Sequence, residues 1–264
     1  MTATALAPAK INLTLHVTGR RADGYHLLDS IVAFASVGDR LTVGPGDRLT
    51  VTGPFAQGVP TDDRNLVRRA LAMAGTPRSV ELEKILPHPG GIGGGSSDAA
   101  VALRLAGASL ALDDLLGLGA DMPVCALGRA ARVRGIGGQV DALDLPQLHA
   151  VLVHPGLSLP TPDVFRALDR ADNAGHEDIP PGGSASNWLD WLADQRNDLE
   201  APAMTLAPDL ADVLTQIART DASIVRMSGS GATCFGLYPR AEDAADAAEG
   251  LQRPGWWVRS CTLG

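Results

Sequence analysis

The chain has 264 residues, of which 45% are hydrophobic, and a formal net charge of −8. This length is sufficient for one large globular domain or two smaller ones. The acidic balance argues against the basic face that nucleic-acid-binding proteins carry, so any bound phosphate must be held by a local arrangement of residues.

The cysteines and the N-terminal sequence bear on the compartment. Cys125, Cys234 and Cys261 are far apart and match neither a disulfide framework nor a zinc site, so we expect reduced thiols in or near the core. The first residues lack a basic segment followed by a long apolar one, and no apolar run reaches the length of a membrane span. We therefore expect a cytoplasmic protein without a membrane partner.

The first predicted element is a strand over residues 9–17, AKINLTLHV. Its residues alternate between an apolar and a polar side, the pattern of a half-buried strand. The polar side carries Lys10, Asn12, Thr14 and His16. A solvated sheet face would explain this pattern without a function. However, Lys10 is one of only two lysines, beside 20 arginines, which suggests a role that needs a compact ammonium group.

The rest of the N-terminal half alternates strands and short helices. A loop or hairpin tip after residue 17 leads into a second apolar strand. Further strands are predicted over residues 39–53, as two segments around a Gly-Pro-Gly turn, and over 78–86. Helices are predicted over 65–75, over 96–111 and from 112, the last followed by a glycine-bounded loop that ends at 128.

The character of the sequence changes near residue 147. A buried strand is predicted over residues 149–156, then a helix over 161–171 and a polar, mobile connection over 172–187. Helices over 188–194 and 208–219 precede a final series of strand, glycine-rich turn, strand, helix and strand. Because strands and helices mix in both halves, we expect an α+β chain of two domains, residues 1–147 and 148–264.

A run with five glycines at residues 90–95 lies between a predicted strand and a predicted helix. Backbone N–H groups and the helix dipole form an anion site at such a position, and glycines remove Cβ atoms that would keep a polyphosphate away. Gly95 is followed by Ser96 and not by lysine, which excludes a Walker loop. No register gives G-x-G-x-x-G, which excludes the dinucleotide and protein-kinase loops. A purely structural turn is the alternative.

Three segments in order resemble the three motifs of the GHMP small-molecule kinases: PAKINLTLHV, GGIGGGSSDAA and MSGSGATCF. The resemblance spans nearly the whole chain. It implies the two-domain GHMP kinase fold, with an N-terminal domain like the second domain of ribosomal protein S5 and a ferredoxin-like C-terminal domain. It also implies ATP and Mg²⁺ as cofactors.

Three further segments narrow the resemblance: TGRRADGYHLLDSIV, GADMPV and HPGLSLPTPDVF. They resemble the members of the superfamily that phosphorylate the 2-hydroxyl of a cytidylated methylerythritol on the non-mevalonate route to isoprenoid precursors. The partner implied is this small molecule. Two alternatives stay open: a GHMP kinase that acts on mevalonate, homoserine or a sugar, and a nucleotide-binding homologue without catalysis.

The resemblance implies that Lys10 and Asp121 flank the substrate hydroxyl. Asp121 would accept the hydroxyl proton as the oxygen attacks the γ-phosphate, and Lys10 would stabilise developing charge. By itself, an aspartate before Met122 and Pro123 could simply begin a turn.

The resemblance also places the cytosine base between Tyr25 and Phe165, with His26 hydrogen-bonded to the base edge. The chain has only ten Phe, Trp and Tyr residues, so an aromatic residue in a polar loop favours stacking over core packing. The remaining implied substrate contacts are Asn12, Thr161 and Gly229. For Gly229, and for Gly231 beside it, a tight hairpin turn is the alternative.

The phosphates of ATP would lie along the glycine run, with serine hydroxyls at the helix start offered to phosphate or Mg²⁺. The implied nucleotide contacts are Asn65, Lys84, Pro87, Gly90, Gly91, Gly93, Gly94, Gly95, Ser96 and Ser97. Asn65 and Lys84 could equally be surface residues. The sequence assigns no metal ligand and no oligomeric state.

Two features depart from the family pattern. Pro89, after His88, stands where the family usually has glycine or a small residue, and it lacks an N–H. The segment between Asp98 and Asp121 is shorter than expected by several residues. Neither change touches a predicted catalytic side chain, so both bear on nucleotide affinity more than on the reaction.

Overall fold

The computed structural model describes residues 2–264, which fall into two compact units. The first unit consists of the described residues up to Lys10, of Val37–His88 and of Gly93–Gly128. The second consists of Ile11–Ser36, Pro89–Ile92 and Arg129–Gly264. Position 147 lies inside the second unit, and domain limits at residues 1–147 and 148–264 stay a prediction.

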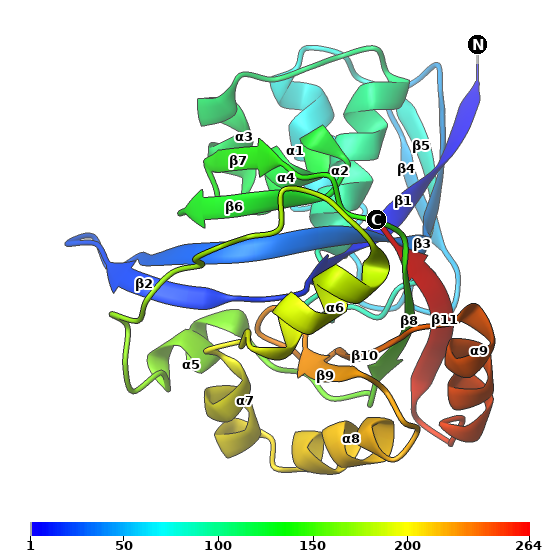
Figure 1. Cartoon of the computed structure of the whole chain (residues 1–264). Coiled ribbons are helices and arrows are strands. Elements are labelled where there is room, and N and C mark those ends of the chain that lie inside the picture. The colour runs from blue at the N-terminus through cyan, green and yellow to red at the C-terminus, as the bar shows by residue number, and fades with distance from the viewer. Residues whose placement is uncertain (1) are drawn as a thin grey trace. The chain divides into compact units, whose positions relative to one another are not determined.

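The first unit packs helices on strands (Figure 1). Its strands are β1 (Ala3–Asn12) as far as Lys10, β3 (His26–Gly44) from Val37 on, β4 (Leu49–Thr52) and β5 (Ser79–Glu83). Its helices are α1 (Leu66–Met73), α2 (Gly94–Leu105), α3 (Leu112–Leu118) and α4 (Met122–Leu127). β5 pairs antiparallel with β3 and parallel with β4. α1 packs against α2, and both bury apolar side chains in one core with β3, β4 and β5.

The second unit is built on an antiparallel sheet in which β11, β8, β10 and β9 follow one another. Its strands are the first part of β3, β2 (His16–Arg20), β6 (Ala131–Gly135), β7 (Gln139–Ala142), β8 (Leu148–His154), β9 (Ile224–Met227), β10 (Cys234–Tyr238) and β11 (Trp257–Leu263). Its helices are α5 (Thr161–Arg166), α6 (Ala185–Ala193), α7 (Glu200–Leu206), α8 (Asp209–Ala218) and α9 (Ala241–Gly250). α8 packs on β9 and β10, and α9 on β8 and β11 (Figure 1). β3 pairs with β2 and β6.

The predicted α+β mixture is confirmed, and so is the final series of strand, turn, strand, helix and strand. The predicted helix over 96–111 begins earlier, at Gly94, and ends at Leu105. The glycine-bounded loop predicted before residue 128 is wrong, because α4 occupies it directly after Asp121, with Pro123 in the first turn, where proline is favoured. The hairpin of β6 and β7 and the helix α7 have no counterpart among the predicted elements.

The burial of the thiols and the lengths of the helices bear on two expectations from the sequence. Cys125 and Cys234 are buried and Cys261 is partly buried, which confirms their expected place in or near the core, whereas their reduced state stays a prediction. Over residues 2–264, each helix is too short or too polar to span a bilayer.

The expected half-buried strand over 9–17 is wrong in two respects. β1 ends at Asn12 and β2 begins at His16, and the polar side is as buried as the apolar side. The strand is interrupted at Leu13 and Thr14, because the N–H groups of both residues donate to one carbonyl oxygen, that of Ile31, at 2.8 and 3.4 Å. The N–H of Ile31 donates to Oγ1 of Thr14 at 2.8 Å. Polar groups that find such partners can be buried.

His16, at the start of β2, stacks on His176 with ring centroids 4.0 Å apart. His176 lies in the connection over residues 172–187, and its backbone N–H donates to Oδ2 of Asp29 at 2.9 Å. Arg132 donates two hydrogen bonds to the same carboxylate, at 2.8 and 2.6 Å. Burial alone would raise the pKa of Asp29, but the hydrogen bonds from Arg132 and His176 hold this pKa well below its usual range. The irregular connection is thereby tied to β3.

We predict that His16 makes the fold less stable as the pH falls. Burial, and to a smaller extent the nearby His176, lowers the pKa of His16 from 6.5 to about 4. The unfolded chain therefore takes up this proton before the folded chain does, and stability is lost as the pH falls between these two values. From pH 7.5 to pH 5 the loss is about 2 kcal/mol.

The variant His16→Phe keeps a ring against His176 and removes the titration. Urea unfolding at pH 7.5 and pH 5 should show that the wild-type protein loses about 2 kcal/mol more than the variant. Burial also lowers the pKa of His154 to about 4, but His154 titrates in both proteins and its effect cancels. Equal losses in the two proteins would contradict the prediction.

Candidate active site

The two predicted catalytic side chains form an ion pair in the first unit. Lys10 lies near the end of β1, and its Nζ is 3.1 Å from Oδ1 of Asp121, the residue before α4. The lysine side chain is 4% exposed and the aspartate side chain 43%. An accessible carboxylate held by a buried ammonium group can accept a proton from a bound hydroxyl group.

The helix α2 begins beside Lys10. Gly93 precedes the helix with φ of +62°, and a Cβ atom at this position would lie 3.0 Å from Cβ and Cε of Lys10. Gly95 is exposed, and a Cβ atom there would meet nothing within 4 Å. Because the first N–H groups of a helix have no partners within it, the backbone at Gly94, Gly95 and Ser96 can bind an anion such as a phosphate. Ser96 is partly exposed, whereas Ser97 is buried.

The first glycines of the run contact the turn after β9, in the second unit. The carbonyl oxygen of Gly90 accepts hydrogen bonds from Oγ1 and N–H of Thr233 at 2.5 and 3.3 Å. The carbonyl oxygen of Gly91 accepts one from Oγ of Ser228 at 3.3 Å. A Cβ atom at Gly91 would lie 2.4 Å from the carbonyl oxygen of Gly231. Gly91 thus has a reason to be glycine that does not involve a phosphate. Gly231 has its own reason, because its φ is +85° and a Cβ atom there would lie 2.6 Å from Sδ of Met227.

Asn65 and Lys84 are buried, which excludes the alternative that they are surface residues. Asn65 caps α1: its Oδ1 accepts a hydrogen bond from the N–H of Val67 at 2.9 Å, and its Nδ2 donates to the carbonyl oxygen of Pro60 at 2.8 Å. Lys84, directly after β5, is held by carboxylates. Pro87 is buried as well.

The predicted base-binding residues lie in the second unit. The rings of His26 and Phe165 stack with centroids 4.9 Å apart and an interplanar angle of 22°. Tyr25 lies between β2 and β3 and is 65% exposed. Burial, and to a smaller extent the charge of Arg20, lowers the pKa of His26, so its ring favours the neutral form. A cytosine ring on Phe165 would therefore have to replace His26 or use the opposite face of the phenyl ring.

The other predicted substrate contacts gather around the turn after β9. The N–H of Asn12 donates to Oγ of Ser228 at 3.0 Å, and Nδ2 of Asn12 donates to Oγ of Ser30 at 2.8 Å. A Cβ atom at Gly229 would lie 3.2 Å from Oδ1 of Asn12. Thr161, the first residue of α5, shares a hydrogen bond of 2.8 Å with Ser230.

The residues that hold this turn in place were not predicted from the sequence. Nδ2 of Asn197 donates to the carbonyl oxygens of Met227 and Gly229, both at 2.8 Å. Oε2 of Glu200 accepts a hydrogen bond from the N–H of Met227 at 2.7 Å, and burial raises the pKa of Glu200. The only sequence feature that could have drawn attention to them is the polar run RNDLE at residues 196–200.

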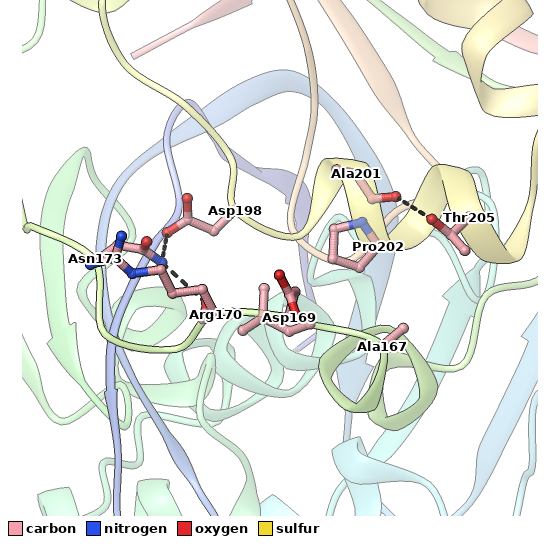
Figure 2. Close-up of a pocket in the computed structure, with 9 residues that line it drawn as sticks. Ala167, Asp169, Arg170, Asn173, Asp198, Ala201, Pro202 and Thr205 are labelled. Atoms are coloured by element: carbon pink, nitrogen blue, oxygen red, sulfur yellow. Dashed lines mark hydrogen bonds between the residues drawn. The ribbon is translucent and has the colours of Figure 1, made fainter.

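A pocket of about 290 Å³ lies between the chain that follows α5 and the helix α7 (Figure 2). Its lining residues are Ala167, Leu168, Asp169, Arg170, Asn173, Asp198, Ala201, Pro202 and Thr205. Asn173 donates to Asp198 at 3.2 Å and Thr205 to the carbonyl oxygen of Ala201 at 3.1 Å, so these polar groups already have protein partners. None of the predicted site residues lines this pocket.

Known proteins similar to this chain include several kinases. A sequence model of the GHMP kinases C-terminal family matches residues 182–255. The 4-diphosphocytidyl-2-C-methyl-D-erythritol kinase of Dinoroseobacter shibae is 52% identical over 268 aligned positions, which cover 97% of this chain and 93% of that protein.

Two solved structures are also similar. A crystal structure of 4-(cytidine 5'-diphospho)-2C-methyl-D-erythritol kinase matches with a TM-score of 0.79 and 39% identity, and 99% of each chain is covered. The homoserine kinase of Cytophaga hutchinsonii matches with a TM-score of 0.68 and 19% identity over 99% of this chain and 95% of that one. This second likeness concerns the fold alone.

Proposed function

This chain belongs to the 4-diphosphocytidyl-2-C-methyl-D-erythritol kinases. We propose that the ion pair of Lys10 and Asp121 is its catalytic pair for phosphoryl transfer. Membership of this family confirms the resemblance and the GHMP kinase fold expected from the sequence. The chain is an ATP-dependent kinase of the non-mevalonate route to isoprenoid precursors. The observation that carries the proposal is a buried ammonium group that holds an exposed carboxylate beside the start of α2.

The proposed reaction uses Asp121 as proton acceptor. The 2-hydroxyl oxygen of the cytidylated alcohol attacks the γ-phosphorus of ATP and gives its proton to the carboxylate of Asp121. A bond forms between this oxygen and the γ-phosphorus, and the bond from the γ-phosphorus to the bridging oxygen of ADP breaks. Lys10 keeps the carboxylate oriented through its ion pair at 3.1 Å and offsets negative charge near the reacting oxygen.

The proposed ATP site is the start of α2. The N–H groups of Gly94, Gly95 and Ser96 would meet the phosphates, and Gly93 brings this backbone to Lys10 without a Cβ atom between them. The contacts of Asn65, Lys84, Pro87, Gly90, Gly91 and Ser97 with the nucleotide stay predictions.

We also propose Mg²⁺ as the companion of ATP. In the part of the chain that the structure describes, no three or more His, Cys, Asp or Glu side chains group to hold a metal ion. Mg²⁺ binds largely through substrate phosphates and water, and Ser96 would offer it an accessible hydroxyl group at the helix start. When bound, Mg²⁺ would neutralise part of the charge of the transferred phosphate.

The second unit would hold the cytidylated alcohol. The proposal rests on Tyr25 and the stacked rings of His26 and Phe165, which present aromatic faces to a base. Asn12, Thr161 and Gly229, around the turn after β9, would contact the rest of the substrate. The cytoplasmic location and the absence of a nucleic-acid partner, expected from the sequence, stay predictions.

The activity is tested by ADP release. Purified protein with Mg-ATP should release ADP with 4-diphosphocytidyl-2-C-methyl-D-erythritol and at background rate with mevalonate, with homoserine and without an acceptor. Release with mevalonate or homoserine would instead favour another GHMP kinase. Binding of both substrates to the folded protein without release would favour a nucleotide-binding homologue that has lost catalysis.

Asp121→Asn should abolish most turnover without weakening binding. The amide keeps the size of the side chain but cannot accept the hydroxyl proton, so we expect kcat to fall at least about 100-fold. The KM values for ATP and for the alcohol should stay within about threefold, because the interaction is lost only in the transition state. Steady-state kinetics measure both, and a variant with near-native kcat would refute the role of Asp121.

Tyr25→Ala should weaken the cytidylated substrate selectively. Stacking of a base on an aromatic ring contributes about 1–3 kcal/mol, so we expect the KM for the alcohol to rise at least about fivefold while the KM for ATP is unchanged. Tyr25→Phe keeps the ring and is the matched control, with native KM values. An unchanged KM for the alcohol in Tyr25→Ala would show that the ring does not stack on the base.

A further inference from the structure

Lys84 is enclosed by two carboxylates directly after β5. Its Nζ donates one hydrogen bond to Oδ2 of Asp39, on β3, and another to Oδ2 of Asp98, on α2, the latter at 2.9 Å. All three side chains are at most 3% exposed. The ammonium group therefore has protein partners on two different elements.

Asp39 holds the chain where the glycine-rich loop (residues 87–93) starts. Its Oδ1 accepts hydrogen bonds from the N–H groups of Ile85 at 2.6 Å and Leu86 at 2.9 Å, the residues directly before the loop. Its other oxygen binds Lys84. One carboxylate thus orients three consecutive residues, and hydrogen bonds to a charged acceptor are the short and strong ones.

Asp98 and Gly94 hold the chain where the loop ends. Asp98 lies in α2, so its hydrogen bond with Lys84 ties this helix to the residue after β5. A Cβ atom at Gly94, the first residue of the helix, would lie 3.4 Å from Nζ of Lys84. The first turn of α2 therefore rests against the same ammonium group that Asp39 binds.

The charges make this arrangement specific. Burial alone would lower the pKa of Lys84, but the carboxylates of Asp98 and Asp39 raise it, so the ammonium form is retained. Burial raises the pKa of Asp98. Separating the three groups would leave a buried charge without a partner, which is strongly unfavourable. The two ends of the loop are therefore held in one relative arrangement.

We propose that Asp39, Lys84 and Asp98 form a clamp that positions both ends of the glycine-rich loop for ATP. The inference rests on the proposed function, in which the start of α2 binds the phosphates. Lys84, which the sequence predicts as a nucleotide contact, is then a positioning residue that acts through the loop in place of that contact. A loop rich in glycine has many conformations, and fixing its ends reduces the entropy lost when a phosphate binds.

The test is Asp39→Asn, which keeps the shape of the side chain and an acceptor for the amides but removes the charge that faces Lys84. We expect the KM for ATP to rise about tenfold and the KM for the alcohol to stay within about twofold. The matched control is Glu83→Gln. Glu83 is the neighbour of Lys84 in the chain, and it pairs with Arg40, the neighbour of Asp39, at 3.8 Å. This pair is exposed, so the KM values for ATP and for the alcohol should both stay native.

Two direct measurements accompany the kinetics. Calorimetric titration with ATP should show a loss of affinity of about the same factor of ten. Hydrogen exchange without nucleotide should be faster at the amides of Ile85 and Leu86 in Asp39→Asn and unchanged in Glu83→Gln. A folded variant with native affinity for ATP, or one in which both KM values rise equally, would overturn the clamp, since a merely structural role does not distinguish the substrates.

A second variant covers the case in which Asp39→Asn does not fold. Lys84→Met combined with Asp39→Asn and Asp98→Asn removes all three charges, leaves no buried charge unpaired, and is expected to fold. We expect its affinity for ATP to stay about tenfold below that of the wild type, and native affinity would overturn the proposal. Wild-type protein that binds ATP but does not phosphorylate the alcohol would refute the proposed function alone, because calorimetry and hydrogen exchange test the clamp without turnover.

Discussion

The pairing of buried lysine with aspartate is the constraint on which the first unit depends. Both lysines of the chain are buried, Lys10 against Asp121 and Lys84 between Asp39 and Asp98. Burying an ammonium group without a partner destabilises the fold by far more than one surface ion pair stabilises it. Each lysine therefore requires its carboxylates in place, and this requirement joins β1 to the residue before α4 and β5 to β3 and α2.

Arginine serves a different purpose in the second unit. Arg226 is buried and donates to the carbonyl oxygens of Leu13, Leu192 and Gln195 at 2.8, 3.0 and 2.6 Å. A planar guanidinium group has five donors in a fixed fork and suits several separate acceptors, whereas an ammonium group is a compact charge that fits between two oxygens. The bias of 20 arginines to two lysines is therefore informative: lysine remains at the two positions where the charge is enclosed.

Much of the secondary structure could be predicted because it rests on local patterns. The alternation in residues 78–86, the cap at Asn65 and the glycines before α2 are each readable within one turn or one strand. The burial of the polar side of residues 9–17 could not be predicted, because the groups that satisfy its side chains, such as Ser30 and Asp121, come from distant segments.

The same distinction applies to the site. The roles of Lys10 and Asp121 were predicted from a family resemblance, and the fold places Nζ of the lysine 3.1 Å from Oδ1 of the aspartate. Asp39 and Asn197 carry no local sequence pattern, because each acts on backbone groups that only the folded chain brings near.

The glycine run itself combines two different requirements. Gly91 is needed where the backbone of Gly231 approaches, whereas Gly93 has φ of +62° at the start of the helix. Pro89 lies exposed before both. Its missing N–H therefore removes no donor from the start of α2, and its fixed φ stiffens the loop. The same substitution at Gly93 would be far more damaging, because proline cannot adopt the left-handed conformation that places the helix beside Lys10.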